Sequence, residues 1–329
     1  KLGILFTSRN NYEMFDLWFE NSTSEGFDIL SIDEDSTEEN KKIGKQICEK
    51  YNITYMDREK RGMFNNIETA KKYFKNKDID WIIWFQHDCY PLTKDFFKKV
   101  NDLILTGNLD GFGAISFNVC HGFEDIDAYK GGDSQLKFTC RAPLEVGDLY
   151  YRHKYRTLPN GRGKQYCWIN SRVDYTSGKF NNPFSIECAG FGVLLNFDMW
   201  TKHIEVTDDY IFYLTFDDIS LQFLYKNIHN ICIPNLTLAH HFQSKRKFNI
   251  PISSPKGTND ERDFYFGEES DDRAQKIFTE RWGFNYGFRN SFESVKDNYK
   301  GTLLWDFYHH DPINGPLKSF PEIIYEEDR

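Results

Sequence analysis

The feature that most constrains the fold of this chain is an apolar run, residues 81–85, that stops abruptly at a polar turn. A continuous apolar run of this length is typical of a central strand that is buried on both faces of a sheet. The turn reads Gln86-His87-Asp88-Cys89-Tyr90-Pro91. A carboxylate at the end of a strand is well placed to bind a hard divalent cation, although an ordinary turn aspartate is the alternative. Asp88 is therefore the first candidate metal ligand, and His87 beside it could be a second.

The pattern around this strand predicts an α/β fold, because short apolar runs alternate with segments of helical periodicity. We expect strands at residues 2–7, 27–32, 53–56, 81–85 and 111–117, and helices at residues 38–51, 64–74 and 94–105. Open α/β sheets bind ligands beyond the carboxyl ends of their strands. Asp33 and Asp35 follow the second strand, where they could hydrogen-bond a nucleobase or ribose or simply shape a turn.

Regular patterning returns after a Gly-, Tyr- and Arg-rich stretch at residues 121–183. We expect a strand within residues 184–197, a helix that starts at Asp217-Asp218, and short strands at residues 231–234 and 236–239 before His240-His241. Paired acids at a helix start can cap the helix, or one of them can act as a general base. An imidazole such as that of His240 is an acceptable ligand for Mn²⁺, or it is a buried hydrogen-bonding group.

The composition limits the partners of the chain. A formal net charge of −9 argues against nucleic acid, which selects basic surfaces. The seven cysteines are odd in number and include no CxxC pair, which favours a reducing compartment over a disulfide framework. No apolar run approaches the ~20 residues that span a bilayer. We expect a cytoplasmic protein without a transmembrane segment, with peripheral membrane association through a lipid-linked acceptor or a partner left open.

Taken in chain order, these pieces resemble the family-2 glycosyltransferases, which have the GT-A fold. The acidic turn at residues 29–37 is similar to the family's element after its second strand, and Arg61 lies in a segment similar to the one that follows. The turn at Asp88 stands where the family has its metal-binding DxD element, although Gln86 replaces the first acid. Further similar segments are residues 187–192, 216–221, 231–241 and 278–283.

The resemblance implies a GT-A sheet flanked by helices and a metal-dependent transfer of a sugar from a nucleotide donor, with UDP as the first choice. It implies that Mn²⁺ or Mg²⁺ binds at Asp88 with His240 as a further ligand, and that Asp218 is the general base of an inverting reaction beside Asp217. A retaining reaction is not decided by the sequence. The donor would contact the residues at the strand ends, which are Thr7, Ser8, Arg9, Asp33, Asp35, Arg61 and His87.

The expected domain is residues 1–283, with residues 121–183 as an insertion and residues 284–329 as a C-terminal extension packed on it. These two parts lie outside the resemblance, so we expect them to select the acceptor, a glycan or another hydroxyl compound.

Two other functions fit parts of the sequence. A nucleotidyltransferase also binds a nucleotide at a metal, but it would have a Gly-rich basic loop where this chain has Ser8-Arg9-Asn10-Asn11. An inactive carbohydrate-binding or scaffold protein would explain the altered metal element at Gln86.

Overall fold

The computed structural model describes most of the expected sheet and its helices. The described residues are 1–10, 26–59, 62–86, 89–91, 94–106, 111–121, 192–205, 214–240, 271–285 and 294–305, single residues between these ranges, and short strands between residues 139 and 185. Three predicted site residues, Arg61, His87 and Asp88, lie outside them, as does most of the predicted insertion.

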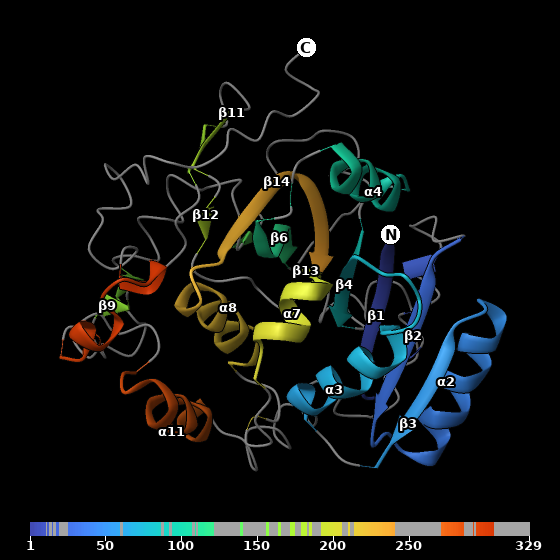
Figure 1. Ribbon diagram of the computed structural model, residues 1–329. Coiled ribbons are helices and arrows are strands. Elements are labelled where there is room, and N and C mark those ends of the chain that lie inside the picture. The colour runs from blue at the N-terminus through green and yellow to red at the C-terminus, as the bar shows by residue number, and fades with distance from the viewer. Residues whose placement is uncertain are drawn as a thin grey trace.

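A mixed, mainly parallel sheet forms the centre of the molecule (Figure 1). Its main path runs in the order β12-β14-β6-β13-β4-β1-β2-β3, with β5 paired to β14 and β7 paired to β6. The strands are β1 (Leu2–Ser8), β2 (Asp28–Glu34), β3 (Thr54–Arg58), β4 (Trp81–Gln86), β5 (Cys89–Pro91), β6 (Phe112–His121), β7 (Thr139–Cys140), β12 (Phe184–Ser185), β13 (Val193–Asn196) and β14 (His229–His240). Two small hairpins lie outside this sheet, β8 (Arg156–Thr157) with β9 (Lys164–Gln165), and β10 (Arg172–Asp174) with β11 (Lys179–Asn182).

The strand pairings give six strands one common direction. Strands β1, β2, β3 and β4 pair in parallel, as do β6 and β14, and β13 is antiparallel to both β4 and β6. The carboxyl ends of β1, β2, β3, β4, β6 and β14 therefore lie at the same edge of the sheet. The α/β fold with a mixed sheet and flanking helices that the sequence predicted is confirmed.

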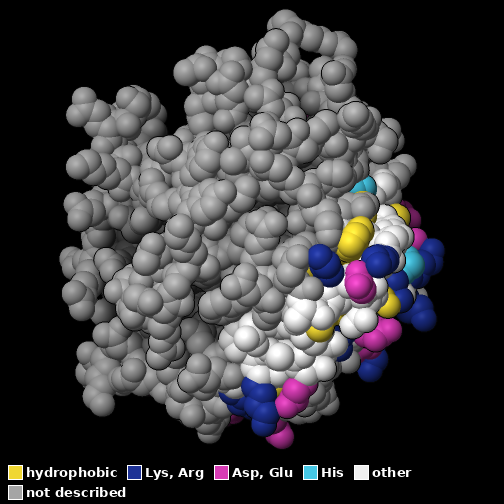
Figure 2. Space-filling view, turned by 90° about the vertical axis from the view of Figure 1, so that its left-hand side faces the viewer, with side chains coloured by type: hydrophobic (Ala, Val, Ile, Leu, Met, Phe, Trp, Pro, Cys, Tyr) yellow, Lys and Arg dark blue, Asp and Glu magenta, His cyan; other side chains and the backbone are white. Residues whose placement is uncertain are grey.

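The helices cover both faces of this sheet. They are α2 (Glu38–Lys50), α3 (Met63–Phe74), α4 (Phe96–Thr106), α7 (Phe197–His203), α8 (Thr215–Tyr225) and α11 (Asp271–Trp282), with a short 3₁₀ helix, η2 (Lys296–Tyr299). None of the described helices is long and apolar enough to cross a membrane. On the face that Figure 2 presents, the coloured side chains of Lys and Arg are interspersed with those of Asp and Glu, as is usual for a solvated surface.

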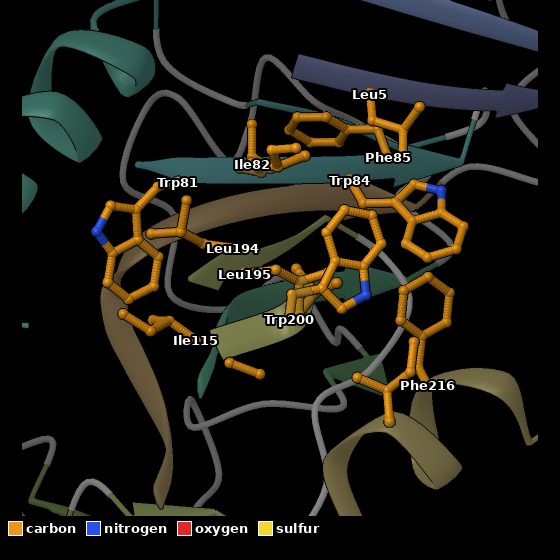
Figure 3. Close-up of a cluster of buried hydrophobic side chains, with 14 of the residues drawn as sticks. Leu5, Trp81, Ile82, Trp84, Phe85, Ile115, Leu194, Leu195, Trp200 and Phe216 are labelled. Atoms are coloured by element: carbon orange, nitrogen blue, oxygen red, sulfur yellow. The ribbon is translucent and has the colours of Figure 1, made fainter. Parts of the chain in front are cut away.

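Strand β4 is the buried central strand that its apolar run predicted. Successive side chains on a strand point to opposite faces, so Trp84 and Phe85 pack against different helices. The Trp84 ring lies 4.8 Å from Phe216 of α8 and 6.1 Å from Trp200 of α7 (Figure 3). The Phe85 ring lies 6.0 Å from Phe97 of α4 on the other face.

Helix α8 lies directly on the backbone of β6. A Cβ atom at Gly113 of β6 would be 2.5 Å from the Phe223 ring of α8, so only glycine allows this approach. Such close packing fixes the height of α8 above the sheet and thereby the position of the acidic residues in its first turn.

Strand β14 differs from the prediction of two short strands. It is one strand from His229 to His240, with a register shift against β6 between Ile233 and Thr237. Pro234 lies in this shift and has no N–H group to donate, which explains why the pairing is interrupted while the strand continues.

Candidate active site

The first turn of α8 lies at the same edge of the sheet as the carboxyl ends of the parallel strands. Only the turn at residues 226–228 separates the end of α8 from the start of β14, and α8 packs on β14 and β6. The helix therefore runs antiparallel to β14, so Asp217 and Asp218 lie at the carboxyl edge. Two groups of predicted site residues, one on α8 and one on β1 and β2, thus share one edge.

The residues at the end of β1 lie at this edge. Thr7 is buried and its Oγ1 accepts a hydrogen bond from Trp84 Nε1 at 3.0 Å. The Ser8 hydroxyl is buried and has no hydrogen-bond partner among the described residues. Arg9 is half-buried, and its Nε donates to the backbone oxygen of Asp35 at 3.4 Å. The Thr7 hydroxyl therefore already has a hydrogen bond within the protein, whereas the Ser8 hydroxyl has none among the described residues.

Asp33 joins the segment after β1 to the turn after β2. It is fully buried, and its carboxylate accepts hydrogen bonds from the Tyr12 hydroxyl and, at 2.9 Å, from the backbone N–H of Ser36. The backbone N–H of Asn10 donates to Ser36 Oγ at 2.8 Å, which ties the two loops together again. Asp35 has a left-handed φ of 59°, a conformation that aspartate tolerates in turns.

Glu34 is a buried carboxyl group that the sequence reasoning missed. It accepts a hydrogen bond from Asn66 Nδ2 of α3, and Asn66 Oδ1 accepts one from Arg58 Nη1 at 3.1 Å. Burial raises the pKa of Glu34 to about 7, against the lowering effects of the Asn66 hydrogen bond and of Arg58 and Arg9. The strand was expected to end at residue 32, and extending it to the acidic cluster would have identified Glu34 as a strand residue.

The N-terminus of α3 lies close to the candidate base. Its N-cap, Gly62, has a φ of 129°, and a Cβ there would lie 2.9 Å from Asn65 Nδ2 and 3.4 Å from the backbone oxygen of Tyr210. The first turn of α3 contains no acidic residue. Because a helix N-terminus favours negative charge, this position is chemically suited to an anionic group.

Asp218 is the most extensively bonded carboxylate of the predicted site. It is fully buried, and its Oδ2 accepts from Tyr210 Oη at 3.2 Å and from Trp282 Nε1 at 2.8 Å. Arg281 Nε lies 3.1 Å from the same oxygen, while Gln222 Nε2 donates to Oδ1 at 2.6 Å. Burial raises the pKa of Asp218, although Arg281 and the three hydrogen bonds act to lower it.

The partners of Asp218 come from three separate parts of the chain. Tyr210 precedes α8, Gln222 lies one turn further along α8, and Arg281 with Trp282 ends α11. The residue before α8, Leu214, has a left-handed φ of 61°, which is uncommon for leucine and is the kind of backbone strain found at functional sites. Asp217, the other acid of the pair, is only partly buried.

The strand register brings the predicted metal ligand His240 close to the segment that contains Asp88. In the antiparallel pairing of β14 with β5, His240 lies opposite Cys89, which directly follows Asp88 in the sequence. The backbone of His240 is described, whereas its side chain and all of Asp88 and His87 lie outside the described residues. Among the side chains that are described, no group of three or more His, Cys, Asp or Glu residues could hold a metal ion.

No protein-family model and no curated protein matches the sequence. Solved structures do resemble the fold. One is a mannosyltransferase from Pyrobaculum calidifontis in complex with GDP-Man and Mn²⁺, with a TM-score of 0.45 and 10% identity over 72% of this chain and 56% of that one. Another is GalNAc-T7 with UDP, GalNAc and Mn²⁺, with a TM-score of 0.48 and 12% identity over 93% of this chain and 55% of that one.

A third similar structure is S. aureus TarS 1-349, with a TM-score of 0.42 and 11% identity over 75% of this chain and 62% of that one. The chain thus spans between half and two thirds of the length of these three structures. These similarities concern the fold of the chain alone, since the identities lie between 10% and 12%.

Proposed function

We propose that this protein is a metal-dependent glycosyltransferase that moves a sugar from a nucleotide donor, with UDP as the first candidate, to a hydroxyl of a glycan. The observation that supports this most strongly is that the predicted metal ligand His240 and the predicted base Asp218 lie at one edge of the sheet. The register of β14 and β5 brings His240 opposite the residue after Asp88, and α8 carries Asp218 to the same edge.

The residue types at this edge suit a divalent cation. A carboxylate oxygen from Asp88 and an imidazole nitrogen from His240 are ligands that Mn²⁺ accepts. Such a cation, when bound, would offset the negative charge of the donor diphosphate. His87 and Arg61 remain proposed donor contacts on the grounds of sequence.

We assign the nucleoside to the strand ends of β1 and β2. Ser8 has a hydroxyl without a partner among the described residues, and Arg9 and Asp35 are partly exposed. Thr7 and Asp33 already bond to Trp84, Tyr12 and Ser36, which favours a role in shaping the site. The N-terminus of α3, next to Arg61, would favour a negatively charged part of the donor.

We assign the role of general base to Asp218. Its Oδ2 receives three donors, whereas Oδ1 receives only Gln222 Nε2 in the described part of the chain, so Oδ1 keeps a lone pair for a proton. The raised pKa makes the carboxylate a stronger base once it is ionised. The acceptor hydroxyl would give its proton to Oδ1, and its oxygen would bond to the anomeric carbon. The bond from that carbon to the diphosphate oxygen would break, with inversion.

Calorimetric titration with UDP and GDP, with and without Mn²⁺, tests this proposal on the wild type and on Asp88→Ala and His240→Ala. We expect metal-dependent binding of one nucleotide that both substitutions abolish. His203→Ala, which removes a histidine at the end of α7, is the matched control and should bind as the wild type does. Absence of nucleotide binding under all conditions would contradict the transferase proposal.

One observation favours a second function. Two of the four partners of Asp218, Arg281 and Trp282, join α8 to α11, which is a sufficient structural reason for a buried aspartate. A carbohydrate-binding protein that keeps the fold without transferring sugar would need this connection equally. Binding of a sugar by the chain, together with no binding of any nucleotide, would support this function.

A further inference from the structure

We infer that the hollow between α8, α11 and η2 is a binding site for a neutral pyranose ring. The hollow has a volume of about 350 Å³, which is within the usual range for small-ligand sites. Its lining combines aromatic rings with charged and amide groups, namely Glu205, Gln222, Tyr225, Lys226, Arg281, Trp282, Asn298 and Tyr299.

Three aromatic rings form the apolar part of this hollow. The Tyr225 ring meets those of Trp282 and Tyr299 edge-on, with centroids 6.1 Å away in both cases. Trp282 and Tyr299 are buried, and the Tyr299 hydroxyl donates to the backbone oxygen of Trp282. Tyr225 by contrast is 43% exposed, which is unusual among the aromatic residues that the structure describes. A flat, partly exposed ring beside a rigid aromatic wall suits the apolar C–H face of a sugar.

The aromatic wall is held in place from behind. Phe292 stacks on Tyr299 with ring centroids 5.4 Å apart, and Phe284 lies edge-on to Tyr299 at 5.9 Å. Asn227, in the turn after α8, donates to the backbone oxygen of Gly301 at 3.2 Å and accepts from the backbone N–H of Leu303 at 3.0 Å. These contacts fasten the segment that contains η2 to the end of α8, so the hollow is formed before any ligand arrives.

The polar groups of the hollow select a neutral ligand that can both donate and accept hydrogen bonds. Glu205 is negatively charged, whereas Lys226 and Arg281 are positively charged, so an anion meets one like charge and a cation meets two. A polyhydroxylated ring avoids this conflict, because its hydroxyls can donate to the carboxylate and accept from the cations. Asn298 adds an amide that can do either.

The polar groups are also held in position. Gln222 bonds to the backbone N–H of Glu205 at 2.7 Å and to its backbone oxygen at 3.0 Å. Arg281 uses Nε for Asp218 and one Nη2 hydrogen for the Glu205 oxygen at 3.4 Å. A guanidinium group has five N–H donors, and the others on Arg281 have no hydrogen-bond partner among the described residues, although the group lies 6.0 Å from the Trp282 ring centroid. They are therefore available to hydroxyl oxygens of a ligand.

One end of the hollow is lined by Gln222, Arg281 and Trp282, which also contact Asp218, but its other end lies away from that residue. Tyr225 and Lys226 lie at the C-terminal end of α8, two turns from Asp218, or about 10 Å along the helix axis. The inference therefore does not depend on the transfer reaction. Tyr299 and Asn298 lie in the predicted C-terminal extension, where acceptor selection was expected.

Saturation-transfer NMR on the full chain tests the inference with three probes, the methyl glycosides of mannose, galactose and N-acetylglucosamine. We expect the wild type to bind at least one of them without nucleotide or metal. Tyr225→Ala should weaken that binding about ten-fold, because it removes the stacking ring. Tyr225→Phe keeps the ring and should change the affinity by less than about two-fold. Leu105→Ala, which truncates another exposed apolar side chain, is the control and should leave binding unchanged.

Two results would overturn the inference: no saturation transfer from the protein to any of the three glycosides, or equal binding by the wild type and Tyr225→Ala. The nucleotide titration separates this failure from that of the proposed function. Sugar binding without nucleotide binding would support the hollow as a carbohydrate site and contradict the transferase proposal. Nucleotide binding without sugar binding would contradict only the inference about the hollow.

Discussion

Two buried carboxylates at the same edge of the sheet are held in opposite ways. Glu34, at the end of β2, accepts from the neutral amide of Asn66, and Arg58 bonds to that amide instead of to the carboxylate. Asp218, in the first turn of α8, has a guanidinium nitrogen of Arg281 at 3.1 Å and three further donors. The comparison shows two surroundings for a buried acid. Burial raises the pKa of both groups, and at Asp218 the adjacent guanidinium of Arg281 acts most strongly against that rise, whereas at Glu34 the Asn66 amide does so.

The largest effect expected from this comparison is the loss of Asp218. Asp218→Ala leaves Arg281 without its carboxylate and three donors without an acceptor, so the free energy of unfolding should fall by about 3–5 kcal/mol. Urea denaturation measures the change. Asp198→Ala is the matched control, because Asp198 is also a first-turn acid but forms only an exposed pair with Lys202. Its loss should cost less than about 1 kcal/mol. Similar losses in the two variants would refute the contrast.

The next effect is a dependence of stability on pH that comes from Glu34. Its folded pKa of about 7 lies above the ordinary value of 4.5, so the folded state binds the proton more tightly than the unfolded state. The stability that Glu34 contributes is then fully present below about pH 4.5 and is lost as the pH rises through 7. Between these values the wild type should lose about 3 kcal/mol more than Glu34→Gln, which stays neutral. Parallel pH curves for the two proteins would show that folding does not raise the pKa of Glu34.

The smallest effects come from a matched pair of tyrosine substitutions. Tyr210→Phe removes one of four donors to Asp218 and should cost about 1 kcal/mol. Tyr12→Phe removes the hydroxyl that bonds to Asp33, which keeps the hydrogen bond from the backbone of Ser36, and should cost about 2 kcal/mol. Denaturation of both variants gives the order. The reverse order would mean that the number of donors still bonded to the carboxylate does not govern the fall in the free energy of unfolding.

The sequence predicted the parts of the fold that depend on local patterns. The apolar run at residues 81–85 and the acidic pair of α8 lie where their patterns indicated, and Asp35 follows β2, whereas Asp33 lies within that strand. Glu34 was missed because the strand was expected to end two residues too early. β14 was divided at Pro234, although a register shift lets the strand continue through it.

The two partners of Asp218 on α11 could not be predicted from any local pattern. Arg281 and Trp282 are more than 60 residues further along the chain, and periodicity says nothing about contacts at such a separation. The resemblance marked residues 278–283 as a family-like segment without giving their role. The opposition of His240 and Cys89 likewise depends on a long-range strand register.

The most direct test of the account is the release of nucleoside diphosphate from a panel of UDP- and GDP-sugars in the presence of Mn²⁺ and candidate glycan acceptors. Asp218→Asn and Asp198→Asn would be compared with the wild type, after calorimetry has shown that each still binds the nucleotide. The account predicts acceptor-dependent release by the wild type and Asp198→Asn, and a rate at least about 100-fold lower for Asp218→Asn. Release by Asp218→Asn at the wild-type rate, or no release by the wild type from any donor, would contradict it.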